Sequence, residues 1–463
     1  MRRRSLKSSA CFAAKATKST LVVHVHTLAS AKSWLKKQPA EVRAWVRDIG
    51  VSLKVGTVLL VPKRAGGVGS VLFVRSDAPT PWQAAKLPAA LPKGRYSLRG
   101  ASGSVAETLA FGWALSEYRY DKYKDSPRIP RELVWPKGVD KKRVLRLADA
   151  TYLVRDLITT PANDMLPADL EATARGLAKK HKARVTVTTG DALLAKYPTV
   201  HAVGRASDNA PRVIDLRWGN AKHPKVTLVG KGVCFDSGGL DLKSAAGMLL
   251  MKKDMGGAAH VLGLAHAIMD AKLPVRLRVF VPAVENSVSG NAFRPLDVIK
   301  SAKGLTVEIG NTDAEGRLIM CDCLHHASKD NPEVLIDFAT LTGAARVALG
   351  TELPALFCND DRLAGEILTQ GTKAHDPLWR MPLWDAYERY LDSRVADTSN
   401  TGSTRFGGAI TAALFLRKFV DPAISWVHID VMAWNSENRT GRPKGGEAMG
   451  LRALYSMLER RYG

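Results

Sequence analysis

The sequence predicts an α/β fold in which a smaller N-terminal α/β domain is joined by a long helix to a C-terminal α/β domain with a mixed, largely parallel central sheet. Two observations carry this prediction. Short β-branched runs alternate with helical stretches along most of the chain, as expected for strands joined by crossover helices. The 463 residues also exceed the length of one ordinary domain, which is about 100–200 residues.

The N-terminal third contains a basic segment followed by a small domain. Residues 1–20 carry six Lys or Arg and no Asp or Glu, and they lack the apolar stretch of a secretory signal. We expect a basic leader or a disordered terminus there, with an organelle transit peptide as the alternative. In residues 21–136, the strand-like runs LVVHVH, VGTVLLV and SVLFV surround the helical stretch AKSWLKKQPAEVRAWVRDI. These runs predict the N-terminal α/β domain.

A domain boundary is expected where Pro127, Pro130 and Pro136 interrupt the chain. The stretch KKRVLRLADATYLVRDLIT follows and predicts a long helix that ends at a Thr-Pro pair, so residues 137–165 form a linker helix and loop. Residues 166–463 form the second domain. Its strand-like runs are separated by helical stretches and include ARVTVTT, RVIDLRW, KVTLVG, VRLRVFVPAV, EVLIDFA and WVHIDVMAW.

Composition excludes several classes of protein. With 46% hydrophobic residues, 24% charged residues and a mean hydropathy of −0.10, the chain is typical of globular proteins and not of disordered or collagenous ones. No run of about 18 apolar residues occurs, so we expect no membrane-spanning helix and no membrane partner. Five cysteines without a C-x-x-C pair argue against a disulfide framework and favour a reducing compartment.

Positive charge is concentrated in the N-terminal third. Residues 1–150 hold 29 Lys or Arg and 10 Asp or Glu, which gives a net charge of +19 out of +24 for the whole chain. Residues 151–463 therefore carry only +5. Such asymmetry indicates either a surface that binds a polyanion such as nucleic acid or a solvated basic face that only aids solubility.

Two glycine-punctuated segments carry the strongest chemical signal. The first, VGKGVCFDSGGLDLKSAAGMLLMKKDMGGAA at 229–259, begins with a strand-like run and then breaks into a loop. This loop contains Lys231, Asp236, Lys243 and Asp254. Because α/β proteins bind ligands outside the carboxyl ends of their strands, these side chains are candidate site residues.

The second segment, EIGNTDAEGRL at 308–318, places Asp313, Glu315 and Arg317 at alternate positions. In an extended chain, alternate side chains lie on one side. Carboxylates from two loops repel one another unless a cation lies between them. Together with the two aspartates of the first segment, these acids supply enough oxygen ligands for two divalent ions about 3.5–4 Å apart. The alternative is that each acid is a solvated loop residue or a helix cap.

Other common catalytic sites do not match the sequence. The lysine of VGKGVCFDSGG precedes its loop, so the spacing is not that of a phosphate-binding loop. Neither H-E-x-x-H nor G-x-S-x-G occurs. A dinuclear phosphoesterase is a further alternative at this point, because it also uses paired metal ions.

The runs VGKGVCFDSGG, KKDMGGAA and NTDAEGRL resemble, in residues and in spacing, those of the leucyl aminopeptidases of the dizinc cytosol aminopeptidase family, peptidase family M17. The similarity extends through RDLITTPANDMLP, DFATLTGA, GGAITAALFL and WVHIDVMAW and so covers residues 155–463. The N-terminal portion is only weakly similar to the family's variable domain. The resemblance implies a metal-dependent aminopeptidase, a hydrolase of proteolysis, with residues 166–463 as the catalytic metallopeptidase domain.

The resemblance also implies a ligand set for two divalent metal ions per subunit, zinc or manganese. Asp236 and Glu315 resemble the bridging ligands, and Lys231, Asp254 and Asp313 resemble the remaining ligands. A lysine binds a metal only as the free amine, so a nearby dication must lower its pKa strongly. This unusual ligand argues against the phosphoesterase.

The remaining implied roles concern the reaction and the substrate. Lys243 resembles the residue that stabilises the oxyanion in this family. Arg317 resembles the residue that holds a bicarbonate ion, and a local salt bridge is its alternative role. Met251, Thr340 and Gly343 resemble residues that line the first substrate pocket. An apolar wall fits broad specificity for Leu, Met and similar N-terminal residues.

The same resemblance implies partners and a location. The substrates would be short peptides, and the enzyme would be a cytoplasmic homohexamer with active sites facing an interior cavity. An organelle is the alternative location, if residues 1–20 are a transit peptide that directs import. A nucleic-acid-binding regulator acting through the basic N-terminal domain is the alternative function, alone or alongside peptidase activity.

Overall fold

The computed structural model describes residues 7–124 and 130–463, and its contacts divide the chain into two units. The first unit comprises Met1–Tyr152 with Ser436–Lys444, and the second comprises Leu153–Asn435 with Gly445–Gly463. This division falls inside the helix α5 (Lys141–Thr159) and not at residues 136 and 165. The predicted boundaries stay a prediction, and Pro127 lies outside the described residues.

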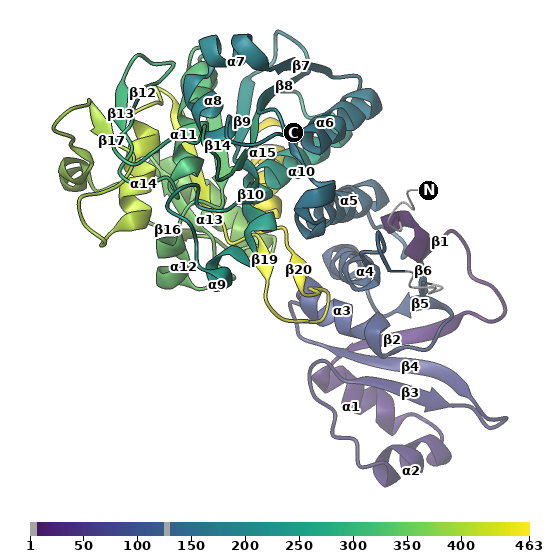
Figure 1. The fold of residues 1–463 in the computed structure, drawn as a ribbon. Helices are drawn as coiled ribbons and strands as arrows, with labels where there is room; N and C mark the ends of the chain where they lie inside the picture. Colours follow the sequence, from purple (N-terminus) through teal and green to yellow (C-terminus); the bar gives the residue numbers. More distant parts are fainter. Residues whose placement is uncertain (1–6, 125–129) are drawn as a thin grey trace. The chain divides into compact units, whose positions relative to one another are not determined.

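The first unit is a sheet with helices on both faces (Figure 1). Its elements are η1 (Ser8–Cys11), β1 (Phe12–Ala13), β2 (Leu21–Thr27), α1 (Leu28–Lys36), α2 (Ala40–Asp48), β3 (Val58–Pro62), β4 (Val68–Arg75), α3 (Pro81–Ala90), β5 (Arg95–Arg99), α4 (Gly103–Glu117) and β6 (Glu132–Val134). The strand order is β1-β6-β5-β2-β4-β3. Ala31 of α1 and Val46 of α2 pack with Leu59 and Leu72 of the sheet, so these helices cover one face. Helices α3 and α4 pack together on the other.

Residues 8–13 are part of this first unit. Phe12–Ala13 pairs in parallel with the strand Glu132–Val134, and the Phe12 ring stacks on Trp135 with 3.9 Å between ring centroids. The neighbouring Cys11 is only 1% exposed. The structure therefore differs here from the expectation of a leader or disordered terminus over residues 1–20, because buried side chains and sheet pairing hold this segment.

The segment 436–444 also belongs to the first unit, although most of its neighbours in sequence belong to the second. The Arg442 guanidinium lies over the Trp82 ring, 3.6 Å from its centroid. Gly441 adopts a φ of +72°, and a Cβ atom at this position would lie 2.8 Å from the Cβ of Ala85. A glycine is therefore needed where this loop passes α3.

The second unit contains the elements η2 (Ala162–Asp164), α6 (Pro167–His181), β7 (Arg184–Thr188), α7 (Gly190–Lys196), α8 (Pro198–Gly204), β8 (Arg212–Trp218), β9 (Lys225–Gly230), β10 (Gly232–Asp236), α9 (Ala245–Met248), η3 (Met251–Met255), α10 (Gly256–Ala271), β11 (Arg276–Asn286), β12 (Val298–Lys300), β13 (Thr306–Glu308), α11 (Glu315–Ser328), β14 (Val334–Ala339), α12 (Gly343–Leu349), β15 (Ala355–Cys358), α13 (Asp361–Lys373), β16 (Trp379–Arg380), η4 (Asp385–Leu391), β17 (Thr398–Ser399), α14 (Gly408–Arg417), β18 (Ser425–Asp430), β19 (Trp434–Asn435), β20 (Gly445–Gly446) and α15 (Leu451–Tyr462). The main sheet has the order β16-β15-β18-β14-β9-β11-β8-β7, and β10 pairs with β11.

The central strands of this sheet are parallel. Strand β9 pairs in parallel with β11 and β14, and β14 pairs in parallel with β18. Antiparallel pairs occur toward the edges, between β11 and β8, β8 and β7, and β18 and β15. Helices α8, α11 and α14 pack together, and α10 packs with α6 and α15 and against β9 and β14 (Figure 1). The mixed, mostly parallel α/β fold predicted from the sequence is confirmed.

Helix α10 approaches the central strands closely enough to require a glycine. A Cβ atom on Gly257 would lie 2.1 Å from the carbonyl oxygen of Phe338 in β14 and 2.7 Å from the amide nitrogen of Lys231. No side chain fits in that space. The glycine therefore lets the start of α10 and the ends of β9 and β14 meet at one place.

Candidate active site

The carboxyl ends of the parallel strands bring the chemically active residues together. Lys231 follows β9, Thr340 follows β14, Asp236 ends β10 and Asp430 ends β18. This edge of a parallel sheet is where α/β proteins bind ligands. The segment 229–259 therefore places its lysine and aspartates at the edge of the sheet where a ligand site is expected.

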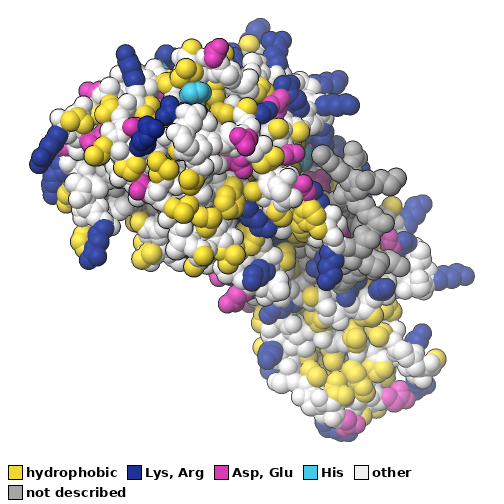
Figure 2. All heavy atoms as spheres, viewed as in Figure 1, with side chains coloured by type: hydrophobic (Ala, Val, Ile, Leu, Met, Phe, Trp, Pro, Cys, Tyr) yellow, Lys and Arg dark blue, Asp and Glu magenta, His cyan; other side chains and the backbone are white. Residues whose placement is uncertain are grey.

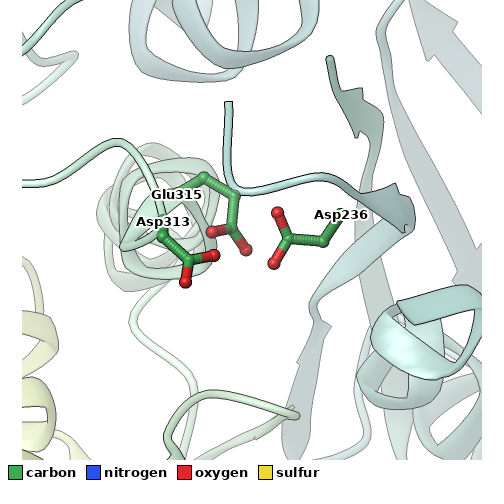
Figure 3. A group of neighbouring side chains, drawn as sticks. All are labelled: Asp236, Asp313 and Glu315. Carbon is green, nitrogen blue, oxygen red and sulfur yellow. The ribbon is translucent and has the colours of Figure 1, made fainter. Parts of the chain in front are cut away.

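Three carboxylates from two loop regions converge in the second unit (Figure 3). Ligand oxygens of Asp236, Asp313 and Glu315 all lie within 4.8 Å of one another. The expected extended chain through Arg317 is wrong, because helix α11 begins at Glu315. The turn from loop to helix still directs Asp313 and Glu315 toward Asp236, whereas Arg317 lies within the helix.

A buried lysine neutralises one side of this cluster. The Lys231 Nζ lies 2.7 Å from Asp254 Oδ2 and 2.8 Å from Glu315 Oε1, and it donates a hydrogen bond of 3.1 Å to the Thr340 carbonyl. Burial lowers the pKa of Lys231, but the carboxylates of Asp254, Glu315 and Asp236 outweigh burial and raise it. The lysine is therefore an ammonium ion in this state of the protein.

A second lysine neutralises the other side. The Lys243 Nζ lies 2.8 Å from Asp236 Oδ2 and also donates to Asp313 Oδ1. Burial opposes the charged form, but these two carboxylates raise the pKa of Lys243. Each of the two lysines that the sequence singled out therefore bridges carboxylates.

The two lysines do not fully neutralise the carboxylate cluster, because the pKa values of two of its members are still raised. Burial, and then the charge of Asp236, raise the pKa of Glu315 to about 8 and that of Asp313 to about 6. Asp254 Oδ2 and Glu315 Oε1 are buried, and their contact with the Lys231 ammonium does not have the geometry of a hydrogen bond. Crowded carboxylate oxygens are the ligands that divalent cations prefer, so the residues present fit a metal site.

Polar residues that the sequence interpretation missed hold the two loops together. Asn286 Nδ2 donates to Asp236 Oδ1 at 2.9 Å and to the Thr312 carbonyl at 3.1 Å. Thr312 in turn receives a 2.8 Å hydrogen bond from the Asp241 amide. Asn286 ends strand β11, so its place at a strand end was the available signal. Thr312 lies inside the NTDAEGRL run but lacks a charge that would have drawn notice.

A cavity of about 470 Å³ opens beside the cluster. Its lining includes most of the residues singled out in the sequence, namely Lys231, Asp236, Lys243, Met251, Asp254, Asp313, Thr340 and Gly343. Two residues stand outside this lining: Glu315 lies against Lys231, and Arg317 lies deeper in the fold. Lys253 and Asp430 also line the cavity, and the sequence interpretation missed both.

Arg317 is buried, with 8% of its surface exposed, and its Nη1 donates a 2.8 Å hydrogen bond to the Asn400 carbonyl. Its Nε is buried and makes no hydrogen bond. Burial lowers the pKa of the Arg317 guanidinium to about 10. No ion pair joins Arg317 to a carboxylate in the part of the chain that the structure describes. The local salt bridge considered for this residue is therefore absent among the described residues.

The raised pKa values predict how stability changes with pH in protein stripped of metal by a chelator. The pKa of Glu315 rises from 4.5 to about 8 on folding, so the folded state holds its proton more tightly than the unfolded chain. This contribution to stability is complete below pH 4.5 and is lost as the pH rises through 8. We expect the melting temperature to fall by several degrees between pH 6 and pH 8. In Glu315→Gln this fall should be smaller, and an equal fall in both proteins would contradict the assignment.

Comparison with known protein families settles the identity of the fold. The model of the cytosol aminopeptidase family catalytic domain matches residues 152–455. The chain belongs to this family. The model of the M17 aminopeptidase N-terminal domain also matches, over residues 23–136. The cytosol aminopeptidase family consists of metal-dependent hydrolases, and this chain is an aminopeptidase of that kind.

Individual relatives of this cytosol aminopeptidase agree with the assignment. A probable cytosol aminopeptidase of Geobacter sp. is 41% identical over 77% of this chain and 76% of its own length. The crystal structure of cytosol aminopeptidase from Coxiella burnetii is 45% identical, with a TM-score of 0.94 over 98% of this chain and all of that one. A mutant of tomato leucine aminopeptidase is 29% identical, with a TM-score of 0.82 over 96% of this chain and 94% of that one.

These comparisons give no support to the alternative of a nucleic-acid-binding regulator, because the basic N-terminal portion matches a domain of the aminopeptidases themselves. On the face drawn in Figure 2, Lys and Arg side chains are dispersed among other residues and do not form one continuous stripe. None of the helices in the described residues is long and apolar enough to cross a membrane.

Proposed function

We propose that this aminopeptidase releases N-terminal Leu, Met and similar residues from short peptides, using two divalent metal ions. The observation that carries the proposal is the cluster of buried and half-buried carboxylates and lysines at the wall of a cavity of about 470 Å³. We assign Lys231, Asp236, Asp254, Asp313 and Glu315 as metal ligands. Zinc and manganese are the proposed ions, and a structure of the relative BotP in complex with Mn supports manganese as a candidate.

The bound ions would supply Lewis acidity toward the scissile carbonyl and toward water. For Lys231 to serve as a ligand, its ammonium must lose a proton, which the present contacts with Asp254 and Glu315 oppose. Metal uptake should therefore release protons. The cavity wall at Met251, Thr340 and Gly343 would hold the side chain of the released residue.

Two cations of the chain have proposed catalytic roles. Lys243 borders the cavity and can donate a hydrogen bond to the carbonyl oxygen as negative charge develops on it. Arg317 would hold a bicarbonate ion, and its buried Nε, which makes no hydrogen bond, supports an anion there. An anion held there would supply proton-transfer chemistry between the water and the leaving amine, and the role of Arg317 would be to bind and orient it.

Assembly and location follow from the same proposal. We propose a homohexamer, which sedimentation or light scattering would test through the mass of the native particle. We propose the cytoplasm as the location, on the ground that the relatives are named cytosol aminopeptidases. An import signal in residues 1–20 is the alternative, and N-terminal sequencing of the protein from its cells would distinguish the two.

Metal removal tests the proposed function directly. Hydrolysis of leucyl p-nitroanilide should disappear after dialysis against a chelator and return when zinc or manganese is added back. Elemental analysis should find two ions per subunit in the active form. Activity that survives complete removal of metal would refute the proposal.

A further inference from the structure

Lys253 is a buried cation that the proposed chemistry does not use. It lies in η3, between the proposed pocket residue Met251 and the proposed ligand Asp254, and it is 6% exposed. The residue lines the 470 Å³ cavity. A lysine is rarely buried to this extent without a partner, because removing its charge from water is costly.

Lys253 has no counter-ion among the described residues. No carboxylate oxygen in residues 7–124 and 130–463 lies within 4.0 Å of its Nζ, and its side chain donates no hydrogen bond there. The other two lysines of the cavity, Lys231 and Lys243, are both bound to carboxylates. Lys253 therefore differs from them in having its hydrogen-bonding capacity free.

The remaining carboxylate near Lys253 is already engaged. Asp430 Oδ1 accepts hydrogen bonds from the amides of Leu341, at 3.0 Å, and Thr342, at 3.2 Å. Its Oδ2 accepts a 2.6 Å hydrogen bond from the Thr342 hydroxyl. Asp430 thus fixes the turn after β14 and is not paired with Lys253.

A second cation adds to the positive charge of this part of the cavity. Arg346, in the last turn of α12, also lines the cavity. Burial is the main cause that lowers the pKa of Lys253, and the charge of Arg346 lowers it further. Among the described residues, neither Lys253 nor Arg346 forms an ion pair with the carboxylates that bind Lys231 and Lys243, although the charge of Asp254 acts on Lys253 from farther away. A substrate with an anionic side chain could accept hydrogen bonds from Lys253 and Arg346 in the cavity. A substrate with an apolar side chain could not.

We propose that Lys253 selects substrates whose N-terminal residue is acidic, by binding the side-chain carboxylate of Glu or Asp. The inference rests on the proposed function and extends its substrate class beyond apolar residues. Lys253 shares a single turn with Met251 and Asp254, which the proposed function assigns to the substrate side chain and to a metal ion. Lys253 therefore lies next to the two residues to which the proposed function assigns the N-terminal end of the peptide.

The test compares glutamyl and glutaminyl p-nitroanilides, because these substrates have the same shape and differ in charge. In the wild-type enzyme with its metal ions, kcat/KM for the glutamyl substrate should equal or exceed that for the glutaminyl substrate. In Lys253→Met, the ratio of the two values should fall at least tenfold. Lys252→Met is the matched control, since Lys252 donates to the Thr159 carbonyl at 2.7 Å and does not line the cavity.

Several results would overturn the inference. One is a wild-type preference for the glutaminyl substrate. Another is a ratio that falls less than tenfold in Lys253→Met, or falls as far in Lys252→Met. Leu-Gly and its C-terminal amide differ only in the C-terminal carboxylate of the peptide. If Lys253→Met changes only the preference between these two substrates, Lys253 binds that C-terminal carboxylate and the inference is wrong. If leucyl p-nitroanilide is still hydrolysed when one of these results is found, only the inference about Lys253 fails and the proposed function stands. If metal-loaded wild-type enzyme does not hydrolyse leucyl p-nitroanilide at all, the proposed function and the inference both fail.

Should Lys253→Met fail to fold, Lys253→Gln gives the same comparison with a smaller change in polarity. The wild-type enzyme alone offers a further measurement. Free glutamate should inhibit leucyl p-nitroanilide hydrolysis more strongly than free glutamine does, because only glutamate carries the second carboxylate. Equal inhibition by the two amino acids would overturn the inference without any variant.

Discussion

Replacing Asp254 with alanine is expected to lower kcat/KM for leucyl p-nitroanilide by more than about 10³-fold, as removal of a central catalytic group does in other enzymes. Asp254 Oδ2 faces the Lys231 Nζ at 2.7 Å, and its Oδ1 accepts a 2.7 Å hydrogen bond from Thr340. The substitution removes a proposed metal ligand and leaves Lys231 with one carboxylate fewer. Steady-state kinetics together with elemental analysis would measure both effects.

The metal content of Asp254→Ala should fall below two ions per subunit while the fold, followed by circular dichroism, is kept. Asp392→Ala is a suitable control, because Asp392 is exposed and lies away from the cavity lining. Full activity and full metal content in Asp254→Ala would remove Asp254 from the ligand set. A loss of activity in both variants would point to a general effect of the substitutions.

Replacing Lys243 with methionine is expected to lower kcat by about 10²–10³-fold with little change in KM, which is the cost of removing one donor to an oxyanion. Methionine keeps most of the volume of the side chain but removes the ammonium that lies at 2.8 Å from Asp236 and against Asp313. If Lys243 acts on the substrate, metal content should be unchanged. Steady-state kinetics with metal analysis would check this.

The outcome for Lys243→Met separates two roles of this lysine. If metal content falls together with activity, the main role of Lys243 is to hold Asp236 and Asp313 in place. If kcat is unchanged, Lys243 has no part in the reaction. Lys243→Arg supplies a further comparison, because it keeps the charge but changes the geometry of the donor.

The sequence predicted the parts of this protein in which local pattern and tertiary structure agree. The β-branched run before Lys231 is strand β9, and the loop that carries Asp236 lies at the carboxyl edge of the sheet. Alternation in NTDAEGRL indicated that Asp313 and Glu315 act together, although a helix and not a strand carries Glu315. Charged residues at strand ends are informative because the ends of parallel strands meet at one edge.

Contacts between residues distant in sequence were not predictable in this way. Asn286 reaches Asp236 across 50 positions of the sequence, and nothing in its neighbours indicates that partner. Lys252 and Lys253 are adjacent, and the sequence does not show which of them lines the cavity. In the structure Lys252 donates to the Thr159 carbonyl, whereas Lys253 lines the cavity. Residues 8–13 contain no basic residue themselves, but they lie in the basic segment 1–20, whose composition hid their short strand. The strand was not predictable because its pairing with β6 depends on residues about 120 positions away.

The loop 436–444 limits how this chain can be shortened. A truncation that removes residues 1–152 would delete Trp82 and Ala85, against which Arg442 and Gly441 pack. The loop would then expose a surface that is covered in the intact chain, between the short strands Trp434–Asn435 and Gly445–Gly446. A catalytic fragment intended to be soluble on its own therefore needs a redesigned connection across this loop as well as a new N-terminus.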